Sequence, residues 1–231
     1  MNQNKKQTNY LSFHLLFWYF LLFSILGFFI ETFYCYFTTG VWESRKGLLW
    51  GPFCPIYGVG ACFLIFFLQH YKGHPFKLFV FGFLLGSFFE YIGSYVLEAI
   101  YQTRFWDYSY LPFHLNGRIC ITYSIFWGIL SLFLIESVRP FLNRFIFSIA
   151  PKVRNILELF LICFFVINTI VTIYGISKYK EKAILLYEEK GLETYQDSRP
   201  NFLSDETIKK AFPNLRFMNQ DGSEIWIRDI L

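Results

Sequence analysis

Two glutamates lie inside long apolar stretches of the sequence, where an ionisable side chain is unusual. Glu31 and Glu90 each lie four residues after a glycine, in GFFIE and GSFFE. A charge at the centre of a bilayer costs at least about 2.5–3.5 kcal/mol on insertion scales, so both side chains should face the interior of a helix bundle and be protonated or paired. They could bind a cation, a proton or a polar headgroup. The alternative is structural, with each acid bonded to a Tyr, a Trp or the backbone of the opposite hairpin.

Three polar residues of predicted outer loops could complete such a site. Arg118 follows Asn116 in the sequence Asn-Gly-Arg, and it could pair with a glutamate or hold a phosphate or carboxylate through two parallel hydrogen bonds. It could equally be an interfacial arginine that extends its charge to water. Asp107 is either a third acid near the two glutamates or the cap of its own turn, as Asx residues often are.

The elements that position these residues are predicted to span a membrane. The chain has 231 residues, of which 55% are hydrophobic, 23% aromatic and 16% charged, whereas soluble domains carry about 25% charged residues. This composition excludes a cytosolic enzyme, a disulfide-stapled secreted module and a disordered chain. The net charge of +4 comes from Lys and Arg at predicted helix ends, so nucleic acid is not expected as a partner.

Five stretches approach the roughly 20 residues that cross the hydrocarbon core. The first is too long for a signal-peptide core and no cleavage site follows it, so it should remain as a helix. Glycine and prolines interrupt the chain before the second stretch, which predicts irregular backbone covered by protein or by a wet cavity. We therefore expect an all-α polytopic membrane protein, with residues 1–176 as the transmembrane domain and 177–231 as a soluble C-terminal extension. The predicted helices are residues 11–37, 56–71, 76–100, 119–138 and 156–176.

Two short motifs recur in the same order and predict an internal duplication. The glutamate motif occurs in the first and third spans, and residues 50–58 (WGPFCPIYG) align with residues 116–124 (NGRICITYS). The first four spans would then form two helical hairpins related by a pseudo-twofold axis along the membrane normal, and such interrupted repeats point to a transporter site. The alignment matches Gly51 to Gly117, Cys54 to Cys120 and Tyr57 to Tyr123; Tyr57 and Tyr123 join the polar site, and the backbone-shaping residues are Gly51, Pro52, Pro55, Gly58 and Gly117.

Basic residues at the ends of the spans predict that the N-terminus is cytoplasmic. With that orientation the outer loops hold only Arg45, Lys46, Arg104 and Arg118. Three lysines after the last span, at 178, 180 and 182, would then lie outside, which leaves the side of the C-terminal extension open. The inner side would hold Lys5, Lys6, Lys72, Lys77, Arg139, Arg144, Lys152 and Arg154, the last four on or beside a loop over residues 139–155 that is bounded by Pro140 and Pro151.

No pattern for a metal, a cofactor or a catalytic residue occurs in the sequence. The four histidines are scattered, and the five cysteines never form a C-x-x-C pair. There is no P-loop, G-x-G-x-x-G or serine-elbow motif, so this chain is not expected to hydrolyse ATP by itself.

The C-terminal extension should contain helix and strand. Residues 178–190 should prolong the fifth helix as far as Gly191, and Ser204 should begin a short helix that Pro213 stops. Residues 214–231 should form a hairpin that turns at Asp221-Gly222. A unit of this size buries little core alone, so it should pack on the membrane domain or on a partner.

The order of these motifs resembles the ABC-transporter permease family that is CmpB-like, also called type IV. The resemblance rests on GFFIETFY (27–34), RKGLLWGPFCPIYGVG (45–60), GSFFEYIGSYVLE (86–98), FWDYS (105–109) and FHLNGRICITYSIFWG (113–128), and it covers about residues 20–140. It implies a polytopic membrane protein and leaves the fifth span and the extension outside the shared pattern. The signature positions would be Glu31, Gly51, Pro52, Pro55, Tyr57, Gly58, Glu90, Trp106, Asp107, Asn116, Gly117 and Arg118.

Three functions are compatible with these features. The first is a permease-like subunit that moves or binds a small polar or amphiphilic solute together with a separate ATPase, as a homo- or hetero-oligomer. The second is a cell-envelope enzyme or lipid-binding protein, in which the outer acids and Arg118 hold a headgroup of a membrane lipid. The third is a membrane assembly or structural factor whose aromatic helices are partner surface.

Overall fold

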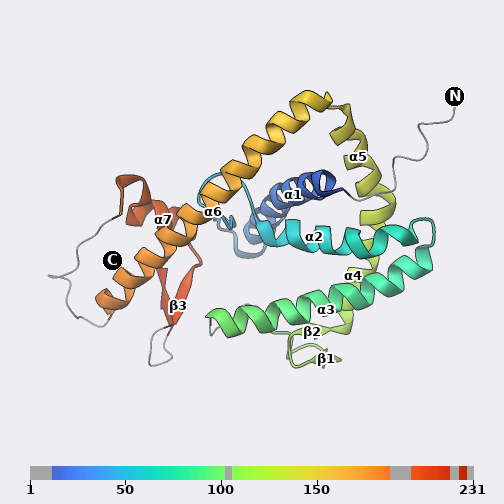
Figure 1. Ribbon diagram of the computed structural model, residues 1–231. Coiled ribbons are helices and arrows are strands. Elements are labelled where there is room, and N and C mark those ends of the chain that lie inside the picture. Colours follow the sequence, from blue (N-terminus) through green and yellow to red (C-terminus); the bar gives the residue numbers. More distant parts are fainter. Residues whose placement is uncertain (1–11, 102–105, 188–198, 219–223, 228–231) are drawn as a thin grey trace.

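Long apolar helices dominate the computed structural model, which describes residues 12–101, 106–187, 199–218 and 224–227 (Figure 1). Within these ranges, four helical segments are long and apolar enough to cross a membrane, at Phe13–Thr39, Pro75–Ala99, Ile121–Ser148 and Pro151–Leu186, and a shorter apolar one covers Pro55–Tyr71. The predicted all-α membrane class is therefore confirmed. The predicted helix end at Gly191 and the predicted turn at Asp221-Gly222 lie outside the described residues.

The first hairpin consists of α1 (Phe13–Thr39) and α2 (Pro55–Leu68), which is extended by the 3₁₀ turn η1 (Gln69–Tyr71). The Ser12 side chain accepts a hydrogen bond from the Leu15 N–H at the start of α1, and Gly40 ends the helix in the left-handed conformation with φ 73°. The two helices lie close together because Gly58 packs directly on the backbone of Phe20. A side chain at position 58 would push them apart.

The segment between α1 and α2 is irregular, as predicted, and part of it is covered by protein. Leu48, Leu49 and Phe53 are buried in it, and Gly51 has φ 79°, a conformation that side chains disfavour. Pro55 opens α2, where its missing N–H costs nothing because the first helical N–H groups have no partner inside the helix.

The second hairpin consists of α3 (Pro75–Tyr101) and α4 (Ile121–Phe133), joined through a small β-hairpin. The strands β1 (His114–Leu115) and β2 (Ile119–Cys120) pair antiparallel, and Asn116 and Gly117 turn between them with φ 52° and 68°. The fourth helix was expected from residue 119, but residues 119–120 pair as a strand before it begins. The Asn-Gly pair is a hairpin signal, so this turn could have been predicted.

The expected loop over residues 139–155 is wrong. The chain continues from α4 through the π-helical turn η2 (Leu134–Val138) into α5 (Arg139–Ser148), and α6 begins at Pro151. A proline inside an α-helix removes one hydrogen bond and clashes with the preceding turn. The π turn directly before Pro140 changes that geometry, so the helix continues where the sequence suggested a break.

The helix α6 (Pro151–Tyr187) begins before and ends after the predicted span and carries the C-terminal elements at its far end (Figure 1). These are η4 (Asn201–Leu203), α7 (Asp205–Ala211), β3 (Arg216–Met218) and β4 (Glu224–Trp226), and the two strands pair antiparallel. Ser204 caps α7, as predicted.

The C-terminal elements share a hydrophobic core with α6 and with Leu49 of the α1–α2 segment. Asn214 also donates a hydrogen bond of 2.8 Å to Glu43. The extension therefore lies at the same end of the molecule as the α1–α2 segment, whereas the α2–α3 turn and α5 lie at the opposite end (Figure 1).

Candidate functional site

Glu31 lies in α1 and is bound by an aromatic side chain of α2. The Tyr57 hydroxyl donates a hydrogen bond to its carboxylate. One turn earlier, Gly27 leaves the space that the Tyr57 ring fills, because a Cβ there would overlap the ring. Glycine, glutamate and tyrosine therefore form one contact between the two helices, with the carboxylate half-buried.

Glu90 has the same arrangement in the second hairpin, with one donor more. The Trp127 Nε1–H of α4 donates to one carboxylate oxygen at 2.5 Å, and the Tyr108 hydroxyl donates to the other at 2.7 Å. Gly86, one turn before the glutamate, is covered by the Trp127 ring. The Tyr108 ring in turn stacks on Tyr123, with centroids 4.4 Å apart.

These contacts make Trp127 the counterpart of Tyr57. The sequence alignment instead paired Tyr57 with Tyr123, one helical turn earlier in α4. In the register of the contacts, Gly58 and Gly128 also correspond, since Gly58 packs on Phe20 and Gly128 packs on Phe79. The same register aligns the Phe-Leu-Ile at residues 63–65 with the Phe-Leu-Ile at residues 133–135.

Arg118 has partners other than the two glutamates singled out in the sequence. Its guanidinium lies 2.7 Å from Glu98 and donates to the Ser94 hydroxyl at 3.1 Å. It is 9% exposed and lies 5.5 Å from the centroid of the Tyr95 ring. Arg118 therefore ties the β1–β2 hairpin to the end of α3, through an acid for which the sequence suggested no special role.

Asp107 and Asn116 are engaged within the same loop region. The Asp107 carboxylate accepts from the Ser109 N–H at 2.9 Å and from the Ser109 hydroxyl at 2.6 Å, the turn-capping arrangement considered above. The Asn116 amide donates to the Tyr91 hydroxyl at 2.9 Å. Trp106 donates to the Arg118 carbonyl at 3.2 Å, so this loop is fastened at several points.

The sequence reasoning missed three polar residues of α6. Glu158 is 4% exposed and lies 2.6 Å from His14 at the start of α1. Asn168 and Thr172 are buried and bond to the backbone of Trp50 and Leu49. An acid and an amide inside the fifth apolar stretch were the available signal, because polar residues at such positions seldom lack a partner.

Metal binding has no support in the described part of the chain, where no group of three His, Cys, Asp or Glu residues could hold an ion. The five cysteines are free thiols and lie in or beside the helices.

The long apolar helices with polar contacts between them define a multi-pass membrane protein. A family model described as "Putative ABC-transporter type IV" matches residues 18–173, and the chain belongs to this family. The match extends through most of α6, so the expectation that the fifth helix lies outside the shared pattern is wrong. The C-terminal elements follow the matched region. Among curated proteins and solved structures, no match to the chain was found.

Proposed function

We propose that this chain is the membrane-embedded permease subunit of an ABC-type transporter, driven by ATP hydrolysis on a separate subunit. Membership of the family supports the transporter assignment. The sequence has no nucleotide-binding motif of its own, so the energy-coupling subunit would be another chain.

The observation that carries the proposal is the paired set of intramembrane carboxylates. Glu31 and Glu90 each lie in an apolar helix and are bound by a hydroxyl or indole donor from the neighbouring segment. Carboxylates inside a membrane mark solute or ion pathways more often than they mark structure. A solute with an amine or hydroxyl group could replace the aromatic donor, so we assign the solute contacts to these two positions.

We further propose that the two hairpins are internal repeats. Matching glycine, glutamate and ring contacts occur in α1–α2 and in α3–α4, and the matched Phe-Leu-Ile sequences follow in the same register. Parallel repeats of this kind are related by an axis along the membrane normal, and solutes bind between them. Four repeated helices enclose little space, so we propose that two copies, or this chain with another membrane subunit, form the pathway.

The proposed orientation places the N-terminus and the α2–α3 turn in the cytoplasm, following the basic residues at that end. Lys72, Lys77 and Arg144 lie there, together with α5. This end offers the surface on which the ATPase would dock. The C-terminal elements would lie on the outer side.

The first test is purification of the tagged full-length chain from its own membrane in mild detergent, with mass spectrometry of the proteins that accompany it. We expect a stoichiometric ATPase whose activity rises when both chains are reconstituted together. Glu31→Gln and Glu90→Gln should each reduce this stimulation at least tenfold without loss of the complex. Glu181→Gln, at an exposed position of α6, is the matched control and should leave it unchanged.

Two other results would contradict the proposal. A homogeneous protein with bound lipid and no ATPase would favour the envelope-enzyme or lipid-binding alternative. Loss of folded protein in both glutamate variants, with normal folding of the control, would favour the assembly factor.

A further inference from the structure

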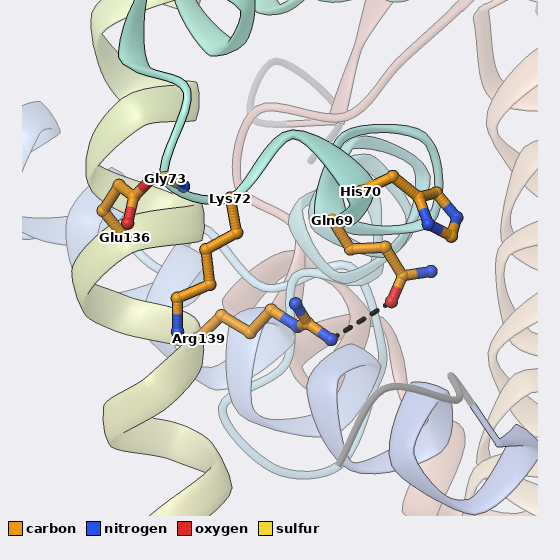
Figure 2. Close-up of a pocket in the computed structure, with 6 residues that line it drawn as sticks. All are labelled: Gln69, His70, Lys72, Gly73, Glu136 and Arg139. Carbon is orange, nitrogen blue, oxygen red and sulfur yellow. Dashed lines mark hydrogen bonds between the residues drawn. The ribbon is translucent and has the colours of Figure 1, made fainter. Parts of the chain in front are cut away.

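A pocket of about 500 Å³ lies at the end of the molecule opposite the C-terminal elements, where the α2–α3 turn meets η2 and α5. Figure 2 shows the side chains that line it. The lining residues are Gln69, His70, Lys72, Gly73, Glu136 and Arg139. None of them belongs to the Glu31 or Glu90 contacts.

Arg139 is the unusual residue of this pocket. It is 7% exposed, and its Nε–H has no hydrogen-bond partner. One terminal nitrogen donates to the Gln69 side chain at 3.1 Å. The Nε–H is itself out of reach of solvent, so the feature that favours a ligand here is the charge: a guanidinium with little water around it is stabilised by an anion in the adjoining pocket.

The charges around Arg139 favour an anion. The Lys72 side chain extends to the same side of the turn as Arg139, whereas the His70 ring points away (Figure 2). Within the described ranges, no carboxylate lies within ion-pair distance of Lys72 or Arg139. The single acid of the pocket, Glu136, accepts a hydrogen bond from the Gly73 N–H at 2.6 Å. The pocket therefore holds two cations against one carboxylate that already has a donor.

We propose that this pocket binds a phosphate group, supplied by the headgroup of an anionic phospholipid at the membrane surface. The planar guanidinium fork of Arg139 matches the oxygens of a phosphate, and the Lys72 ammonium adds a second positive charge at the open side. The pocket lies at the helix ends, where lipid headgroups are found, and polybasic membrane-facing surfaces bind anionic lipid at about 1 kcal/mol per cation. Inorganic phosphate offers the same chemistry from solution, so the test distinguishes the two sources.

The test is a lipid titration of the full chain in phosphatidylcholine nanodiscs that contain increasing phosphatidylglycerol, read as the rise in unfolding temperature that a ligand of the folded state produces. Lys72→Gln should raise the half-saturating phosphatidylglycerol content about fivefold, as expected for one lost cation near the surface. Glu136→Gln should lower it, because the amide keeps the acceptor for Gly73 and removes a negative charge that repels phosphate. Lys77→Gln, on an exposed lysine of α3 outside the pocket, should change it much less than Lys72→Gln does.

Arg139→Lys keeps the charge and removes the fork, and it should weaken binding as much as Lys72→Gln. If this buried position does not tolerate the change, the opposite effects of Lys72→Gln and Glu136→Gln still decide the matter. Stabilisation by millimolar inorganic phosphate in pure phosphatidylcholine, with the same dependence on these residues, would support the pocket as a phosphate site and replace the lipid by a soluble source. Equal titrations in wild type and all pocket variants would overturn the proposal.

Discussion

Asn168 and Trp50 exchange two hydrogen bonds across 118 positions of sequence. The backbone N–H of Trp50 donates to the side-chain carbonyl of Asn168 at 3.1 Å. The side-chain amide of Asn168 donates to the backbone carbonyl of Trp50 at 2.8 Å. Thr172, one turn further along α6, accepts from the Leu49 N–H at 2.9 Å. Irregular backbone inside a membrane needs such partners, because lipid offers none.

Replacement of Asn168 should therefore destabilise the fold. Asn168→Leu leaves an N–H and a carbonyl of the α1–α2 segment without partners, and we expect a loss of about 1–3 kcal/mol in the free energy of unfolding. Chemical unfolding in detergent micelles measures it. Thr169→Leu, on an exposed position of the same helix, is the control and should change little. A similar loss in both variants would mean that the two hydrogen bonds contribute nothing specific.

A methyl group at Gly27 should also destabilise the protein. Its Cβ would overlap the Tyr57 ring, and overpacking of this kind costs about 1–3 kcal/mol. Gly93→Ala is the matched control, because no atom outside its own helix segment lies within 4 Å of the added Cβ. Alanine favours helix over glycine, so the control should be neutral or slightly more stable. Equal thermal stability of the two variants would show that the α1–α2 contact adapts without cost.

Removal of the hydroxyl that binds Glu31 should expose the carboxylate to a competing solute. Tyr57→Phe keeps the ring over Gly27 and removes one hydrogen bond, and such bonds average about 0.6 kcal/mol in membrane proteins. On the proposed function, the solute concentration for half-maximal ATPase stimulation should fall by about threefold. Tyr36→Phe, on an exposed tyrosine of α1, the helix that carries Glu31, should not alter it. A rise in that concentration for Tyr57→Phe would mean that the hydroxyl binds the solute itself.

Docking of the C-terminal elements on α6 should weaken in acid. Burial alone would raise the pKa of Asp205, but hydrogen bonds from Lys182 and Arg199, with their charges, bring the pKa below its ordinary value. A carboxyl group whose folded-state pKa is depressed stabilises the structure above its unfolded pKa of about 3.9, and this stabilisation is lost as the pH falls through the folded-state value. Hydrogen exchange of α7, measured from about pH 6 down to about pH 2, spans the unfolded pKa and should show the loss. Asp205→Asn should remove this pH dependence, whereas Glu206→Gln, at an exposed neighbour, should keep it.

The two ends of the molecule should be reached from opposite sides of the membrane. Lys72 lies at the α2–α3 turn, and Lys210 lies in α7. Burial lowers the pKa of Lys46 in the α1–α2 segment, and the nearby charge of Lys210 lowers it further, so α7 lies beside that segment. A membrane-impermeant thiol reagent applied outside intact cells should label Lys210→Cys and leave Lys72→Cys unlabelled, in a background without the native cysteines. The reverse pattern would place the N-terminus outside and contradict the proposed orientation.

The sequence predicted the helices well because an apolar stretch of membrane length has few alternative structures. It also placed Glu31 and Glu90 inside apolar helices, where a carboxylate is conspicuous. The residue of α4 that binds Glu90 was harder to predict. Trp127 and Tyr123 both lie on α4 one turn apart, and only the packing of a ring on Gly86 decides between them.

Pro140 and Arg118 show where sequence reasoning failed for a physical reason. Proline predicts a helix end, but the helix continues through the π turn η2 and past Pro140. Local sequence gives no signal for such a turn. The partners of Arg118 depend on the direction in which the β1–β2 hairpin folds back. That direction places the guanidinium on Glu98, not on the more conspicuous acids.

The contacts between α6 and the α1–α2 segment have a mechanical consequence. Asn168 and Thr172 bond to that segment and the C-terminal core packs on it, so the first hairpin and α6 should move as one rigid body. The second hairpin is joined to the first by the short α2–α3 turn around Lys72 and Gly73, which makes this turn the natural pivot for rocking of one hairpin against the other. An anion bound in the adjoining pocket would connect this turn to α5 and would restrict that motion.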